Sequence, residues 1–287
     1  MKIPWMKIAC IFSFLSFVLC KASGQVFVND AGTREKHFVY EVKQIDEFFE
    51  RFNNDSNSYV RKVYNTYHVT FKLDRTALIK SLFDYETHSW DANTINSFVE
   101  SVTDPKLPLR LDFYHDNWFA EANCRFQFNA STIQVPIILR IRTNNNGGAK
   151  WVIAAVKPSP LQQDAVVTEI VTSKNKNKNN FINPESHTNN FIELQKVFED
   201  KENLTDYLDA NFFDRKNSNV FYNAVLKNKL NFITVRDIKY HYLQITGWIF
   251  TVEYFPREAL NSGWLISSMK QVSATDKELY KQKLLEE

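Results

Sequence analysis

The residues best suited to acid–base chemistry lie in one short segment near the middle of the chain. Asp112, His115 and Asp116 precede Trp118 there. If this segment is a strand, Asp112, Tyr114 and Asp116 share one face and His115 lies on the other. An acid–base enzyme needs such a group inside an apolar cavity, where its pKa moves toward neutrality. Asp112 and His115 are therefore the catalytic candidates, and a structural histidine is the alternative.

Aromatic residues supply the candidates for ligand binding. The sequence contains 24 Phe and 12 Tyr, and tyrosine suits surfaces that are half exposed to water. We therefore take Tyr114, Trp118, Tyr240 and Tyr242 as candidate ligand-binding residues, with Tyr254 as a further stacking platform. The alternative is that these rings pack the core.

Missing motifs argue against several other kinds of site. No His-x-His, His-x-x-x-His or HExxH pair occurs, so no metal site is expected. Gly-rich phosphate loops and the G-x-S-x-G elbow are also absent, which disfavours a nucleotide cofactor and a serine nucleophile. Cys124 lies in an alternating apolar pattern that predicts a buried, inert thiol. We therefore expect neither a cofactor nor a metal.

The first 24 residues have the layout of a secretory signal peptide. Two lysines precede the apolar run Ile8–Leu19, and the small residues Ala22, Ser23 and Gly24 suit a cleavage site. A transmembrane helix needs about 20 apolar residues, more than this run provides. A lipoprotein signal with a lipid on Cys20 is the alternative, although Leu19 before it is not small. We expect a soluble protein exported to the periplasm or beyond.

Charge and composition limit the fold and the partners. The 35 Lys and Arg nearly balance the 33 Asp and Glu, so a nucleic-acid-binding surface across the protein is not expected. A hydrophobic content of 44% is typical of a folded chain. A Lys/Asn-rich run suggests a linker between two halves. The predicted domains are 25–158 and 183–287, with the linker at 159–182.

Each half places amphipathic helices before strands, which predicts an α+β fold. Apolar stripes mark helices in the first half, with Asp74 and Asp91 as candidate N-caps. Alternation then predicts a meander of antiparallel strands. The predicted strands in the first half lie at 109–114, 120–128, 133–141 and 151–156. In the second half, Asn190 caps a helix, strands lie at 231–245, 248–255 and 263–272, and a capping box at 275–278 starts a C-terminal helix.

The ends of the two halves are locally alike. Lys150-Trp151-Val152-Ile153 and Gly263-Trp264-Leu265-Ile266 both place a tryptophan at the start of a terminal strand. With helices wrapping a bent antiparallel sheet, this pattern resembles bacterial exported NTF2-like (cystatin-like) α+β cones of unassigned function. The resemblance covers about 38–158 and is looser over 183–272. It implies that Trp151 and Trp264 fill the cone and that the open end of the sheet holds a pocket.

These patterns favour an exported soluble binding or scaffold protein of the cell envelope, because no catalytic motif stands out. Its partner would be a small molecule, a glycan or an envelope protein, and not a nucleic acid. A lyase or isomerase that uses the cone pocket is the alternative, and it requires His115 or Asp112 to face that pocket. A subunit of an envelope assembly is the third possibility.

Overall fold

The computed structural model describes residues 41–66, 74–144, 146–157, 180–258 and 261–285. The predicted signal peptide and most of the predicted linker lie outside these residues. No helix within these ranges has the length and apolar character needed to cross a membrane.

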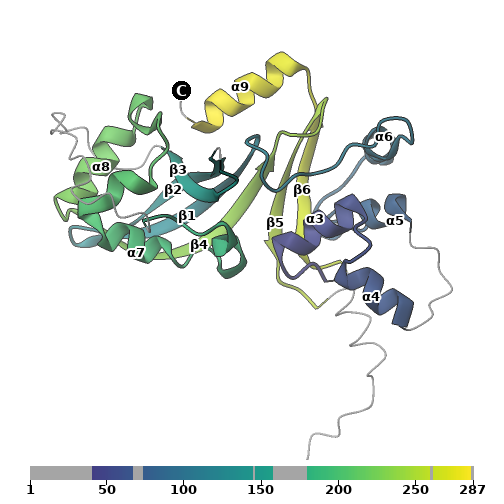
Figure 1. Cartoon of the computed structure of the whole chain (residues 1–287), viewed down its shortest axis with the longest axis horizontal. Helices are drawn as coiled ribbons and strands as arrows, with labels where there is room; N and C mark the ends of the chain where they lie inside the picture. Colours follow the sequence, from purple (N-terminus) through teal and green to yellow (C-terminus); the bar gives the residue numbers. More distant parts are fainter. Residues whose placement is uncertain (1–40, 67–73, 145, 158–179, 259–260, 286–287) are drawn as a thin grey trace, which may run out of the picture. The chain divides into compact units, whose positions relative to one another are not determined.

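The fold is α+β, as the sequence predicts, and is built on one antiparallel sheet of six strands (Figure 1). The strand order is β3-β2-β1-β4-β5-β6. Along the central pair, Trp118 of β1 lies opposite Tyr242 of β4, and Phe128 lies opposite Leu230. The strands are β1 (Trp118–Phe128), β2 (Ser131–Thr143), β3 (Ala149–Val156), β4 (Leu230–Tyr242), β5 (Trp248–Phe255) and β6 (Gly263–Gln271).

The two predicted halves are joined in this sheet. Each half supplies three consecutive strands, and the pairing of β1 with β4 connects them. Side chains from both halves, such as Phe48, Trp118, Phe221 and Trp264, belong to one hydrophobic cluster. The end of the predicted linker is also part of the fold, because Ile182 is buried and accepts a backbone hydrogen bond from Trp151 at 3.0 Å. The sequence-based division therefore marks two strand groups that share one core.

Helices and 3-10 turns flank the strands in both halves. Asp74 and Asp91 cap α5 and α6 as predicted, each accepting a backbone N–H through its carboxylate. The helices are α3 (Ile45–Asn53), α4 (Tyr59–Thr66), α5 (Arg75–Lys80), α6 (Ala92–Thr103), α7 (Leu194–Glu199), α8 (Ser218–Leu226) and α9 (Ala274–Leu285). The 3-10 segments are η1 (Pro184–Asn189), η2 (Lys201–Tyr207) and η3 (Phe212–Asp214).

Two predicted caps lie elsewhere in the structure. The residue after η1 is Asn190, whose left-handed backbone (φ 55°) ends this segment instead of starting a helix. Asparagine tolerates this conformation better than most residues. The capping box of α9 is formed by Ser273 and Asp276, whose side chains accept each other's backbone N–H groups at 3.1 and 3.3 Å. Both errors are shifts along the chain.

The predicted strand at 109–114 is wrong. This segment is irregular, because other groups take its backbone donors. The N–H of Leu109 bonds to the end of α6 at the Val102 carbonyl. The N–H of Leu111 bonds to the Asn53 side chain at 2.8 Å, and the N–H of Asp112 bonds to the Gln244 side chain. Alternating polarity cannot distinguish this arrangement from a strand. The described part of the first half therefore has three strands instead of the predicted four.

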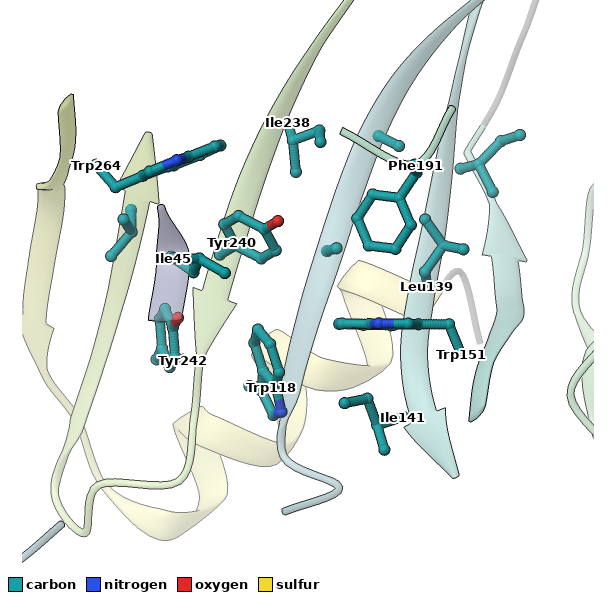
Figure 2. Close-up of a cluster of buried hydrophobic side chains, with 14 of the residues drawn as sticks. Ile45, Trp118, Leu139, Ile141, Trp151, Phe191, Ile238, Tyr240, Tyr242 and Trp264 are labelled. Carbon is teal, nitrogen blue, oxygen red and sulfur yellow. The ribbon is translucent and has the colours of Figure 1, made fainter. Parts of the chain in front are cut away.

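Side-chain alternation gives the sheet two different faces. The inner face carries most of the aromatic core, including Trp118, Trp151, Tyr240, Tyr242 and Trp264 (Figure 2). The outer face carries a smaller apolar cluster that includes the last residues of α9. That smaller cluster contains Phe119, Ile138, Ala154, Ala155, Leu243, Ile249, Leu284 and Leu285.

Irregular segments of the chain cover the outer edge at β3 and the first residues of the outer edge at β6. At β6, Val42 accepts a hydrogen bond from Trp264 N, and the Leu82 carbonyl accepts one from Ile266 N. The other edge, at β3, is bonded by Ile182 and by Asp209. Covering exposed strand edges in this way prevents unwanted strand pairing.

Candidate functional site

The sheet opens between β4 and β5. These strands pair only where Lys239–Tyr242 lies opposite Phe250–Glu253, although β4 begins at Leu230. From Leu230 to Ile238, β4 pairs with β1 on one side, and no other described segment pairs with its second edge. Unlike the covered parts of the outer edges, this internal edge keeps unpaired backbone donors and acceptors.

A cavity of about 500 Å³ occupies this opening, which we call the β4–β5 cleft. Its volume lies within the range of about 300–1,000 Å³ that is typical of ligand pockets. Five parts of the fold contribute to its walls. They are 235–238 of β4, Glu253, Tyr254 and Pro256 at the end of β5, Trp264 of β6, Lys43 and Gln44 before α3, and His187, Thr188 and Asn190 at η1.

The walls of the cleft combine charges of both signs with an aromatic patch. Lys43 and Arg236 provide positive charge, and Asp237 and Glu253 provide negative charge. The rings of Tyr254 and Trp264 lie 5.4 Å apart, and Tyr254 remains 43% exposed. These walls suit a ligand with polar groups and an apolar or planar part. Tyr254, one of the predicted stacking platforms, is therefore part of the cleft.

A histidine and two acids meet beside the cleft. The ligand atoms of Asp46, Glu185 and His187 all lie within 4.8 Å of one another. His187 has a buried side chain, and its Nε2 lies 2.9 Å from Asp46 Oδ1. Its Nδ1 lies 2.7 Å from the Pro184 carbonyl. This group is a candidate cation site that no sequence motif reveals, because Asp46 and His187 are 141 residues apart in the chain.

Three of the predicted ligand-binding residues belong to the inner-face core. Trp118, Tyr240 and Tyr242 have no exposed surface. The Trp118 ring is stacked on Tyr242 with centroids 5.5 Å apart, and Tyr240 contacts Trp264 at 5.1 Å. Burial raises the pKa of both tyrosines, so their hydroxyls stay protonated. This placement favours the alternative that these three rings pack the core. The fourth predicted ligand-binding residue, Tyr114, is 55% exposed but does not line the cleft.

The two catalytic candidates lie in the irregular segment before β1. His115 is partly exposed, and its Nδ1 accepts the backbone N–H of Asn117 at 3.0 Å. Asp112 is exposed and accepts the N–H of Tyr114 at 2.9 Å. Neither residue lines the β4–β5 cleft. The structure therefore does not bring this pair into the apolar environment that acid–base chemistry requires.

A second polar group lies on the outer face under α9. His241 Nε2 lies 3.0 Å from Glu121, and its Nδ1 lies 2.7 Å from the Tyr280 hydroxyl. Lys157 also donates to Glu121 at 2.9 Å. Burial lowers the pKa of His241, which keeps the ring neutral, so its Nε2 donates to Glu121 while Nδ1 accepts from Tyr280. These bonds connect α9 to β1 and β4, and Tyr280 borders a second cavity of about 410 Å³.

No protein-family model, curated protein or solved structure matches this chain. The roles assigned to its residues therefore depend on the geometry described above. The resemblance to NTF2-like cones depends on the sequence pattern and is compatible with the α+β architecture.

Proposed function

We propose that this chain is an exported binding or scaffold protein of the cell envelope that holds an extended segment of a partner protein in the β4–β5 cleft. The observation that carries the proposal is the unpaired edge of β4 at 230–238, of which 235–238 line a cavity of ligand size. The outer edges of the same sheet are covered along β3 and at the start of β6. The cleft offers an extended segment a free strand edge together with a cavity of ligand size.

An extended peptide matches this site in chemistry. Its backbone alternates donors and acceptors at the spacing that a strand edge requires, so main-chain bonds supply affinity. Its alternate side chains would face the aromatic patch of Tyr254 and Trp264 and the charges of Lys43, Arg236 and Asp237. Mixed charge favours a partner segment that carries both signs.

The NTF2-like cone and the repeat between the halves belong to the same proposal. They are supported by the order of helices before strands. They are also supported by the tryptophans near the starts of β3 and β6, Trp151 and Trp264. Export is supported by the signal-like first 24 residues. The lyase or isomerase alternative is less well supported, because Asp112 and His115 do not line the cleft.

Peptide selection tests the proposal. A library of random 12-residue peptides would be selected against the untagged mature chain, and hydrogen exchange would be measured with and without the best binder. We expect slower exchange at the amides of 233–238, because a paired strand edge protects them. A small molecule bound in the cleft would leave most of these edge amides unpaired.

Matched variants locate the binding site. Tyr254→Ala removes a partly exposed ring of the cleft, and we expect it to weaken the selected peptide at least fivefold. Tyr114→Ala removes a ring of similar exposure outside the cleft and should leave affinity unchanged. Failure to select any peptide, or protection that maps away from β4, would refute strand addition at this site.

A further inference from the structure

We propose that Asp46, Glu185 and His187 form a binding site for a first-row divalent transition-metal cation at the rim of the β4–β5 cleft. The three residues come from the first turn of α3 and from η1. This inference does not depend on the proposed function, because cation binding is measured without any peptide.

The distances suit a metal centre after a small movement of one side chain. Metal–ligand bonds of about 2.0–2.2 Å at right or tetrahedral angles place neighbouring ligand atoms about 3.0–3.5 Å apart. His187 Nε2 and Asp46 Oδ1 are already 2.9 Å apart. The widest separation in the group is within 4.8 Å, so closure requires about 1–2 Å of movement. Glu185 is exposed and free to move by a change of rotamer.

The core of the protein orients the His187 ring. The indole N–H of the fully buried Trp151 donates to the Pro184 carbonyl at 2.9 Å. The same carbonyl lies 2.7 Å from His187 Nδ1. A carbonyl can only accept, so Nδ1 carries a proton, and a neutral ring presents the lone pair of Nε2 to the two acids. Metal-bound histidines are usually held in this way, with the second nitrogen donating to a carbonyl or carboxylate.

Nε2 of His187 and Oδ1 of Asp46 face each other at 2.9 Å. A proton can bridge this separation, and so can a metal ion that both atoms bind. No hydrogen bond or ion pair within the described residues reaches the Glu185 carboxylate, so it remains free to act as a ligand.

The donor set selects the class of metal. One imidazole and two carboxylates suit Zn²⁺, Mn²⁺ or Fe²⁺, whereas Ca²⁺ and Mg²⁺ prefer oxygen ligands alone. His187 also lines the cleft, and the exposed Glu185 and half-buried Asp46 leave the acidic side of the site open to solvent. The missing short histidine motifs predict no metal site. Such motifs cannot reveal ligands that come from distant parts of the chain.

Calorimetric titration of Zn²⁺ into the full mature chain, untagged and treated with chelator, tests the site. We expect one Zn²⁺ per chain and no comparable binding of Mg²⁺ or Ca²⁺. Glu185→Gln and Asp46→Asn should each weaken Zn²⁺ binding at least tenfold. Glu202→Gln is the matched control, since it removes an exposed carboxylate from another 3-10 segment and should have no effect.

Histidine ¹H–¹⁵N spectra give a readout that a purely structural ion pair would not. Addition of Zn²⁺ should shift Nε2 of His187 while Nδ1 keeps its proton, and the other ring signals should not move. The proposal is overturned if the chain binds no stoichiometric Zn²⁺. It is equally overturned if both acid variants bind as tightly as the unmodified chain, or if the metal shifts another histidine.

Discussion

Gly263 is the residue at which a single methyl group should do the most damage to the edge of the sheet. Its φ of +85° lies in a region that other residues rarely adopt. A Cβ at this position would lie 2.1 Å from the Val42 carbonyl oxygen, and backbone cannot move aside as a flexible side chain can. We therefore expect Gly263→Ala to lower the free energy of unfolding substantially.

The magnitude follows from two contributions. A left-handed conformation costs a non-glycine residue about 1–2 kcal/mol. The clash also acts on two backbone bonds, from Val42 N to Ser262 at 3.1 Å and from Trp264 N to Val42 at 2.8 Å. Each bond is worth about 0.5–1.5 kcal/mol, so the total loss is about 2–5 kcal/mol. The variant should also disturb the cleft, because Lys43 and Trp264 adjoin these bonds.

Urea unfolding followed by circular dichroism measures the effect, as a lower midpoint at constant slope. Gly247→Ala is the matched control. Gly247 has a φ of +77°, but no heavy atom lies within 4 Å of a Cβ built there. This variant should lose only the conformational contribution, about 1–2 kcal/mol. Equal losses for the two variants would refute the argument from close approach at Val42.

Three further predictions concern other parts of the chain. Although burial opposes ionisation of Glu121, hydrogen bonds with His241 and Lys157 outweigh it and lower its pKa to about 2. The pKa of a glutamate in the unfolded chain is about 4.3. Ionised Glu121 therefore stabilises the fold by up to about 3 kcal/mol above that pH, and this stabilisation is lost as the pH falls toward 2. Unfolding experiments on Glu121→Gln should show a smaller loss of stability between pH 4.5 and 2. Cys124→Ser should be less stable than Cys124→Ala, since a buried hydroxyl without a partner costs about 1–3 kcal/mol. Burial raises the pKa of the Cys124 thiol and keeps it inert, so both variants should bind equally well. Unequal binding would contradict this inert role. N-terminal sequencing of the exported protein should begin at Gln25, and a lipid-modified Cys20 would contradict that cleavage site.

Local patterns in the sequence were sufficient to predict much of the secondary structure. The apolar stripe Ile95, Phe98, Val99 and Val102 is buried on α6, as its spacing predicts. Cys124 is buried on β1, in agreement with the alternation around it. Both results depend on the helical period of 3.6 and the strand period of 2, which involve only residues close in sequence.

The same local patterns give wrong predictions where groups distant in the sequence bind the backbone or cover a face of the sheet. The segment 109–114 alternates like a strand, yet Asn53 and Gln244 side chains take two of its N–H groups. Tyr240 and Tyr242 were predicted to be half-exposed platforms, but they lie on the inner face of a central strand. Alternation shows that two residues share a face and does not show which face is covered.

Short-range periodicity is enough to predict the α+β class, the positions of most helices and strands, and the burial of most apolar stripes. It does not predict that the two strand groups form one sheet, that β4 and β5 separate to leave a free edge, or that Asp46 meets His187. These features depend on which strands pair and on contacts across 141 residues of chain. Such contacts are selected by the packing of the whole core, and no local spacing encodes them.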